Sequence, residues 1–187
     1  MIDKRQILID TALDLFYAHG INTIGINEVL KVSGVAKKTL YNHFRSKEDL
    51  VLATLEKRDQ IFCAWLNDQI QGGDSDQERV QQLFMGLTLW FTNKVPALRP
   101  FRGCFFINSA AEFGDEASEI SRFCKAHKAR VRQLIAESLT QNDDQVLDGL
   151  CLLKEGAIVS AYVNHDYEAA EKCQRMAQAL VSGRVYQ

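Results

Sequence analysis

The sequence predicts an all-helical protein, and three observations support this fold class. Apolar residues recur every three or four positions along most of the chain, with charged residues between them, as in amphipathic helices. No convincing run alternates apolar and polar residues in the way that a half-buried strand does. The two prolines, Pro96 and Pro100, lie close together, so helices elsewhere in the chain are not interrupted by this residue.

The first helix is bounded by signals at both ends. Asp3 and Gln6 have the spacing of a capping box, in which side chains satisfy free N–H groups at the start of a helix. Gly20 is typical of the residue that ends a helix, because glycine adopts positive φ values without strain. A short second helix then covers about residues 25–32.

The third helix covers about residues 36–44, and only the turn Ser33-Gly34 separates it from the second. The fourth begins at the capping signal Ser46-Lys47-Glu48-Asp49 and runs to about Gln71, where Gly72-Gly73 ends it. Further helices are predicted at about residues 76–93, 104–113, 117–140, 143–164 and 167–182. The sequence thus predicts about nine helices in all.

Length and composition indicate one generous domain or two small ones. The chain has 187 residues, of which 47% are hydrophobic and 25% charged, and its formal net charge is −2. The longest uncharged stretch, Val80 to Asn93, is too short and too polar for a membrane span, which needs about 20 apolar residues. No signal-peptide core fits the N-terminal residues. We therefore expect a cytoplasmic protein with no membrane partner.

The five cysteines are scattered along the chain and form no Cys-x-x-Cys pair. This spacing signals neither a structural zinc site nor a redox-active dithiol, and it is typical of reduced intracellular thiols buried as small apolar residues. Cys124 and His127 are one helical turn apart and could begin a metal site, but no second half is evident. We predict no metal and no cofactor.

Charge is unevenly distributed, because a local basic block lies between Lys31 and Lys47. The block holds five basic residues and no acidic one, namely Lys31, Lys37, Lys38, Arg45 and Lys47. On its own, such a block is more often a solvated lysine-rich face than a binding surface. Here it surrounds a helix-turn-helix pattern, which favours a surface that faces phosphate groups.

The predicted third helix has one apolar and one polar face. Leu40 and Phe44 are one turn apart and anchor it on the second helix. At 100° per residue, Lys38 and Asn42 fall near the opposite side. Thr39 and Tyr41 flank these two residues, and Lys37 and His43 lie closer to the anchored edge. The exposed face is short, polar and cationic, as a helix that enters the major groove requires.

These residues resemble a known family. The segment from Thr23 to Leu50 contains a Gly-Val, a Thr-Leu-Tyr, a His-Phe and a Ser-Lys-Glu-x-Leu at specific spacings. In this it resembles the DNA-binding domain of the TetR (tetracycline-repressor-like) family of bacterial transcriptional regulators. The resemblance covers about the first 50 residues. It departs at Val32-Ser33 before Gly34, where an alanine is commoner in the family.

The resemblance implies a helix-turn-helix DNA-binding domain over residues 1–50 and an effector-binding and dimerisation domain over residues 51–187. It also implies a ligand-responsive regulator, most simply a repressor. Such a protein binds a palindromic operator in double-stranded DNA as a homodimer and is released by a small-molecule effector, here unknown. The residues that it places at the DNA are Thr23, Gly25, Lys37, Lys38, Thr39, Tyr41, Asn42, His43 and Lys47.

Two of these residues are expected to read bases, Lys38 a guanine edge and Asn42 an adenine edge. The alternative is that both touch only water or phosphate. Lys47, at the start of the fourth helix, is expected to pair with a phosphate, aided by the free N–H groups of that helix end. Tyr41 is expected at the DNA backbone, and the alternative for it is a partly buried core tyrosine.

The last two predicted helices each carry an apolar stripe that suits a four-helix dimer interface built from two helices of each subunit. The alternative is that the stripes pack on their own chain. The need to hold two recognition helices about 34–36 Å apart favours the dimer. The residues predicted at this interface are Leu150, Ala157, Ile158, Ala161, Ala169, Cys173, Met176 and Leu180.

An effector pocket needs apolar walls and a few polar groups, and aromatic residues gather in the middle helices. The residues predicted to line it are Phe62, Trp65, Trp90, Cys104, Phe105 and Tyr162. Most such aromatics are core residues in proteins of this size. Cys104 follows Gly103 at a predicted helix start near Arg102, and both features lower a thiol pKa. An alternative function is therefore a redox or electrophile sensor acting through Cys104, against the simpler reading of a buried cysteine.

A helical enzyme acting on a bound small molecule is a weaker alternative. The sequence has no Gly-x-Ser-x-Gly, no His-Glu-x-x-His, no Walker loop and no dinucleotide fingerprint. Its four histidines form no evident cluster. We predict no catalytic residues and no enzymatic activity.

Overall fold

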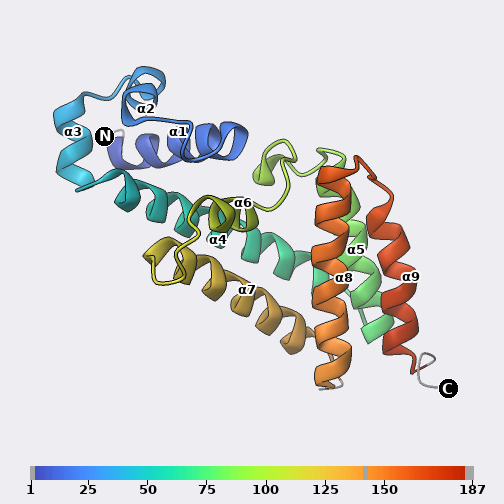
Figure 1. Ribbon diagram of the computed structural model, residues 1–187. Helices are drawn as coiled ribbons and strands as arrows, with labels where there is room; N and C mark the ends of the chain where they lie inside the picture. The colour runs from blue at the N-terminus through green and yellow to red at the C-terminus, as the bar shows by residue number, and fades with distance from the viewer. Residues whose placement is uncertain (1–2, 141–142, 184–187) are drawn as a thin grey trace. The chain divides into compact units, whose positions relative to one another are not determined.

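The structure, a computed structural model, describes residues 3–140 and 143–183, and this part of the chain contains helices and no strand (Figure 1). The prediction of an all-α fold is confirmed, and each predicted helix is present within a few residues of its expected bounds. A short 3-10 helix at Pro96–Leu98, η1, was not predicted. The α-helices are α1 Lys4–His19, α2 Ile26–Ser33, α3 Lys37–His43, α4 Lys47–Ile70, α5 Asp76–Phe91, α6 Phe105–Glu112, α7 Glu119–Ser138, α8 Asp144–Val163 and α9 Ala169–Val181.

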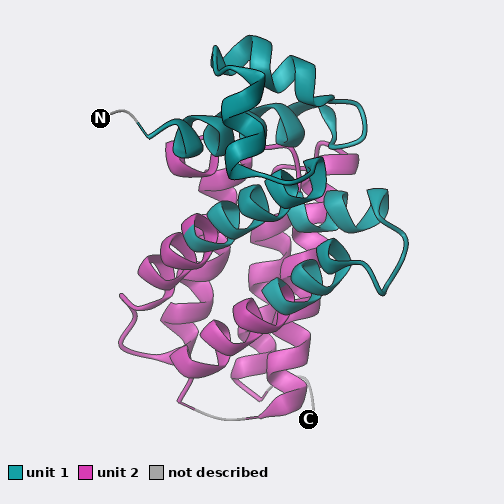
Figure 2. Ribbon diagram, turned by 90° about the vertical axis from the view of Figure 1, so that its left-hand side faces the viewer, with its two compact units in different colours: residues 1–60, 105–127 teal, residues 61–104, 128–187 magenta. Residues whose placement is uncertain are grey.

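The chain divides into two compact units (Figure 2). Unit 1 comprises residues 1–60 and 105–127, and unit 2 comprises residues 61–104 and 128–187. The long helices α4 and α7 therefore each contribute to both units. The sequence predicted a functional boundary at residue 50. The two units of the structure are defined by contacts instead, and unit 1 includes α6 together with the helix-turn-helix.

The helix-turn-helix of unit 1 is built as the sequence predicted. Val29 of α2 and Leu40 of α3 are fully buried, and Phe44, which ends α3, is 3% exposed. Gly34 ends α2 with φ +66° and donates its N–H to the Leu30 carbonyl. A residue with a Cβ is strained at such a positive φ, so glycine makes the tight turn between the two helices.

In unit 2, α8 packs along α9, and both pack against α5 (Figure 1). The inward face of α8 carries the buried residues Leu147, Leu150, Lys154, Ala157, Ile158 and Ala161. This corrects part of the predicted dimer interface. Five of its members, Leu150, Ala157, Ile158, Ala161 and Ala169, are at most 4% exposed in the single chain. They pack on their own chain, because α8 and α9 turn these small and branched side chains toward its core.

No helix in residues 3–140 or 143–183 combines the length and apolar character that crossing a membrane requires.

Candidate functional site

The polar face of α3 is exposed. Lys37, Lys38, Asn42 and His43 all lie on the surface of unit 1, and Tyr41 is 47% exposed. Tyr41 is therefore not a core residue, and that alternative is rejected. Thr39 is half-buried beside them. The seven-residue helix presents these side chains on one side, since Leu40 anchors its other side in the core.

The lysines of α3 are not neutralised by acidic neighbours. In the part of the chain that the structure describes, Lys37 and Lys38 form no ion pair, whereas Lys31 of α2 lies 3.7 Å from Glu28. Their ammonium groups thus remain available to an anionic partner. Uncompensated cations on one short helix give the positive field that phosphate recognition uses.

The helices α2 and α3 also present free backbone donors. Among the described residues, no side chain caps the N-terminus of either helix, unlike α1 and α8, where Asp3 and Asp143 accept hydrogen bonds from first-turn N–H groups. Gly25 precedes α2, and a Cβ placed on it would meet no atom within 4 Å. The protein itself therefore does not require glycine there. An exposed, uncapped helix start without a side chain suits close approach of a phosphate.

Lys47 makes a contact within the protein that the sequence did not reveal. Its Nζ donates a 2.6 Å hydrogen bond to the carbonyl oxygen of Ile21, in the connection between α1 and α2. The same ammonium lies 5.9 Å from the centroid of the Phe16 ring. Lys47 thus connects α4 to the segment before α2. Its ammonium group donates one hydrogen bond within the protein, so only its remaining N–H donors could reach a phosphate.

Aromatic residues predicted for the effector pocket form a connected cluster in unit 2. The Trp90 ring lies 5.6 Å from that of Phe62 and 6.2 Å from that of Trp65, measured between centroids. Phe101, which was not in the predicted set, lies 5.1 Å from Trp90 and 6.2 Å from Tyr162, and so connects them. The structure therefore brings four of the predicted pocket residues into one aromatic cluster.

The other two predicted pocket residues lie in different surroundings. Phe105 belongs to unit 1, where its ring meets Tyr17 edge-on at 5.9 Å. Cys104 belongs to unit 2 and is 7% exposed. Lys128 of α7 donates a hydrogen bond to the Cys104 sulfur at 3.4 Å and another to Glu155 of α8 at 2.7 Å.

Cys104 thus borders a small ionic cluster formed by Lys128, Lys154 and Glu155. Lys154 is 2% exposed and its ammonium binds the Glu155 carboxylate. Burial would raise the pKa of Glu155, but Lys154 and Lys128 outweigh this effect and lower the pKa to about 2. Burial also opposes the charge of Lys128, yet Cys104 and Glu155 raise its pKa above the ordinary value. Lys128 and Glu155 are therefore both charged at neutral pH.

The outer side of α8 and α9 carries an apolar groove of about 650 Å³. Leu152, at 73% exposure, and Met176, at 58%, are the most exposed side chains that line it. Gly149 and Gly156 lie on the same face of α8, two turns apart. Three residues of the predicted dimer interface line this groove, namely Cys173, Met176 and Leu180.

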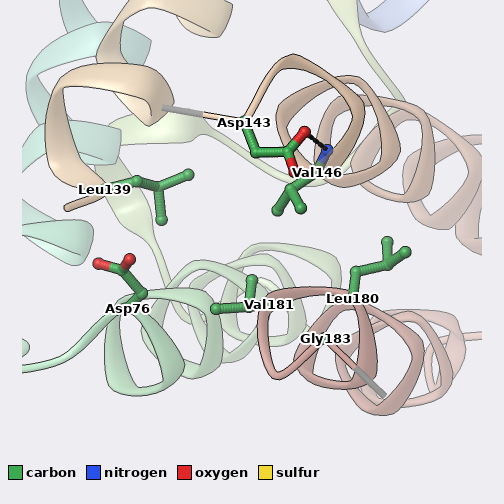
Figure 3. A pocket seen from close by; sticks show the side chains of 7 residues that line it. All are labelled: Asp76, Leu139, Asp143, Val146, Leu180, Val181 and Gly183. Carbon is green, nitrogen blue, oxygen red and sulfur yellow. Dashed lines mark hydrogen bonds between the residues drawn. The ribbon is translucent and has the colours of Figure 1, made fainter. Parts of the chain in front are cut away.

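A second, smaller cavity of about 90 Å³ lies where the end of α9 approaches the starts of α5 and α8 (Figure 3). Its polar groups serve the local backbone, since Asp143 accepts hydrogen bonds from the Gln145 and Val146 N–H groups. Asp76 likewise accepts from the backbone and hydroxyl of Thr140. Asp143 thus caps α8, and Asp76 binds the residue Thr140 that follows α7, so these polar groups are engaged within the protein.

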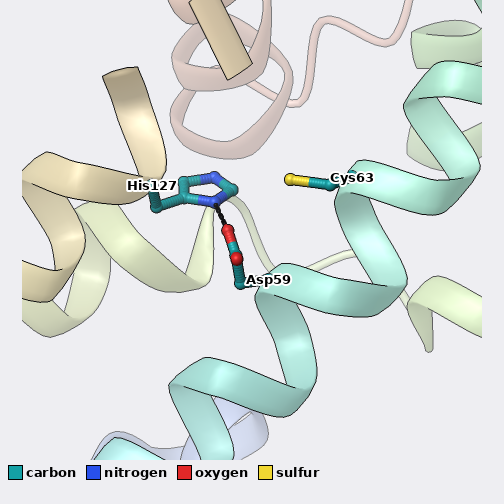
Figure 4. Close-up of side chains that lie close together, drawn as sticks. All are labelled: Asp59, Cys63 and His127. Carbon is teal, nitrogen blue, oxygen red and sulfur yellow. Dashed lines mark hydrogen bonds and ion pairs between the residues drawn. The ribbon is translucent and has the colours of Figure 1, made fainter. Parts of the chain in front are cut away.

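His127 of α7 has a partner that spacing alone did not identify. Its Nδ1 lies 2.6 Å from Asp59 Oδ1 on α4 (Figure 4). Its ring also stacks on Phe106 with 3.4 Å between centroids. The sequence had suggested Cys124 as a neighbour, but the pair in unit 1 joins residues 68 positions apart. Histidine and carboxylate are both metal ligands, yet this pair alone does not make the four-ligand set of a structural zinc site.

Residues 8–54 match the profile of the family described as "Bacterial regulatory proteins, tetR family". The HTH-type transcriptional repressor ComR of Escherichia coli K12 is 27% identical over 139 residues, which are 73% of this chain and 64% of ComR. The HTH-type transcriptional repressor NemR of the same organism is 25% identical over 194 residues, covering 96% of this chain and 94% of NemR.

Solved structures agree with these matches. SCO4454, a TetR-family transcriptional regulator from Streptomyces coelicolor, superposes with a TM-score of 0.83 at 28% identity. That similarity covers 96% of this chain and 95% of SCO4454. Reduced E. coli NemR superposes with a TM-score of 0.77 at 22% identity, over 96% of this chain and 97% of that one, and shares the fold.

Proposed function

The chain belongs to the TetR family of bacterial regulatory proteins, and on that premise we propose that it is a dimeric repressor released from its operator by a small-molecule effector. The observation that carries the proposal is the exposed face of α3, where Lys37 and Lys38 form no ion pair within the described residues. The similar proteins ComR and NemR are named as transcriptional repressors. This supports the expectation that the chain regulates transcription and catalyses no reaction.

We assign base reading to two residues at the exposed centre of α3. Lys38 donates to a guanine edge and Asn42 makes a bidentate contact with an adenine edge. The remaining residues hold the DNA backbone. They are Thr23, Gly25, Lys37, Thr39, Tyr41, His43 and Lys47, and they surround the base-reading pair at the ends and flanks of α2 and α3. All of them except the half-buried Thr39 and Lys47 are exposed, and this exposure and the uncapped helix starts support the division of roles.

The dimer interface is proposed on the outer groove of α8 and α9. An exposed apolar surface that includes Leu152 and Met176 is unfavourable in a lone subunit, and a second copy would cover it. Gly156 on this face leaves room for a helix of the second copy, because a Cβ on it would meet no atom within 4 Å. Gly149 instead allows Leu180 of α9 to pack closely on α8 within the same chain. Operators of this kind are palindromic, since a two-fold dimer places its recognition helices about 34–36 Å apart.

The effector site is proposed at the aromatic cluster around Trp90. An effector that prefers one of two dimer geometries would shift operator binding, and each tenfold shift corresponds to about 1.4 kcal/mol of preference. The rings of Phe62, Trp65, Phe101 and Tyr162 form the cluster with Trp90 and would supply the apolar walls of such a site.

The role of α3 is tested by fluorescence anisotropy on DNA selected by the wild-type protein from random sequence. Lys38→Ala and Asn42→Ala are each expected to cost about 1–3 kcal/mol on the selected site and to relax base preference at one position. Lys125→Ala is the matched control, because it removes an exposed lysine of α7 outside this surface. Unchanged base preference in both α3 variants would reject the assignment of base reading.

Thiol sensing through Cys104 is a second candidate function, and the 3.4 Å hydrogen bond from Lys128 favours it. A neighbouring cation is typical of the surroundings of reactive cysteines. Burial raises the pKa of the Cys151 and Cys173 thiols, which disfavours reaction there.

Iodoacetamide tests this second function. The Cys104 sulfur would form a bond to the reagent's methylene carbon, with iodide as the leaving group. Alkylation is expected to release the wild-type protein from DNA and to leave Cys104→Ser bound. Cys151→Ser, as control, should respond as the wild type does. If Cys104→Ser is released equally, Cys104 is not the sensor.

A further inference from the structure

The connection between α1 and α2 binds a carboxylate from a part of unit 1 that is about 90 residues further along the chain. Glu112, the last residue of α6, accepts the backbone N–H of Ile21 on Oε1 at 2.9 Å and that of Asn22 on Oε2 at 2.6 Å. The Asn22 side chain donates in turn to the Glu112 carbonyl oxygen at 3.4 Å. Both oxygens of one carboxylate thus bind two consecutive peptide groups, and hydrogen bonds to a charged acceptor are stronger than neutral ones.

The same short segment is held from its other side. The carbonyl oxygen of Ile21 accepts the 2.6 Å hydrogen bond from Lys47 of α4, and the Ile21 side chain is 1% exposed. The backbone of Ile21 is therefore fixed at its N–H by α6 and at its carbonyl by α4. A surface connection with both groups bound to ionic side chains is more rigid than one bound to water.

Gly20 lies directly beside this carboxylate and has a backbone conformation that favours glycine. It has φ +87°, which a side chain rarely adopts, and a Cβ on it would lie 3.4 Å from Glu112 Oε1. Glycine at this position allows the backbone to turn from α1 directly onto the carboxylate.

The fixed segment leads directly into the start of α2. Thr23 and Gly25 follow Asn22 closely, both are exposed, and no side chain caps α2. The proposed phosphate contact at this helix start depends on where the connection places the free N–H groups. We propose that Glu112 is a positioning residue for DNA binding, which sets the start of α2 against a phosphate although it does not touch DNA itself. This inference rests on the proposed function.

The position of Glu112 at the end of α6 makes this contact sensitive to where α6 lies. It ends a helix that begins at Phe105, directly after Cys104 in the chain. A displacement of α6 along its axis would withdraw the carboxylate from Ile21 and Asn22. DNA affinity would then fall without any change in α3.

Glu112→Gln tests the proposal, since the amide keeps the shape but replaces one acceptor oxygen with a donor. We expect operator binding to weaken about tenfold or more, as the loss of a charge-assisted hydrogen bond would cause. The salt dependence of binding should become shallower by about one phosphate contact. Amide hydrogen exchange at Ile21 and Asn22 should accelerate.

Glu116→Gln is the matched control, because it removes the same charge from an exposed residue in the same segment. It should retain wild-type affinity and salt dependence. Glu112→Asp keeps the charge with a shorter reach and should give an intermediate affinity, which provides a second variant if Glu112→Gln does not fold.

Two outcomes would overturn the proposal. One is wild-type operator affinity in Glu112→Gln. The other is weaker binding with the wild-type salt dependence and unchanged exchange at Ile21 and Asn22. Failure of the wild-type protein to select any DNA would instead reject the proposed function itself, so the two failures are distinguishable.

Discussion

Replacing Leu152 with glutamate is expected to convert the protein to a monomer and to abolish operator binding. Leu152 is 73% exposed and lines the apolar groove formed by α8 and α9. An unpaired carboxylate buried at an interface costs about 3–5 kcal/mol, and two-fold symmetry places two of them there. The dimer dissociation constant should therefore rise by more than about 100-fold. Sedimentation velocity measures the oligomeric state, and anisotropy measures operator affinity.

Met85→Glu is the control for this experiment. Met85 is a 51% exposed apolar residue of α5 that does not line the groove, so its variant should remain dimeric and bind DNA. If Leu152→Glu stays dimeric at micromolar concentration, the subunits associate through another surface.

Trp90→Ala is expected to destabilise the protein by about 3–5 kcal/mol, the range for removing a large buried aromatic. Trp90 is 1% exposed, and its ring centroid lies within 6.2 Å of four other aromatic rings. Its removal would leave a cavity. The surrounding rings could fill this cavity only in part, because they are fixed on different segments of the chain. Urea denaturation followed by circular dichroism measures the free energy of unfolding.

Trp90→Phe keeps an aromatic ring and should lose less stability than Trp90→Ala. Leu89→Ala is a surface control, because the neighbouring residue is 39% exposed and should change the free energy of unfolding little. A loss below about 1 kcal/mol in Trp90→Ala, which is ordinary for a surface site, would show that the cluster is loosely packed.

The sequence was most informative where a pattern is local. The bounds of α2 and α3, the turn at Gly34 and the exposed face with Lys38 and Asn42 follow from residues close together in the chain. Helical periodicity and glycine chemistry determine these features without reference to the rest of the fold. The burial of Phe44 was predicted from the same periodicity.

Sequence patterns were less informative where one helix has two apolar faces. On α8, Leu150, Ala157 and Ile158 were assigned to the dimer, but they face the chain's own core, and Leu152 lies on the outer face. Periodicity identifies an apolar stripe but does not say which neighbour covers it. Leu152 could have been noticed as an apolar residue outside that stripe.

Long-range polar contacts were beyond local reasoning. The hydrogen bonds of Glu112 to Ile21 and Asn22 join residues about 90 positions apart, and that of His127 to Asp59 spans 68. No spacing rule relates such residues, because their proximity depends on how separate helices fold together. A glutamate at the end of a predicted helix gives no signal of its own.

The assignment of residues 105–127 to unit 1 bears on how such regulators can be recombined. A chimera that joins residues 1–50 to a foreign effector domain would lose Glu112 and leave the N–H groups of Ile21 and Asn22 without their acceptor. A foreign domain with a carboxylate at the matching place would keep these two hydrogen bonds. If Glu112 has the proposed role, the DNA-binding module of this protein is discontinuous in the chain. A graft of residues 1–50 alone should then bind its operator less tightly than one that also carries the second segment.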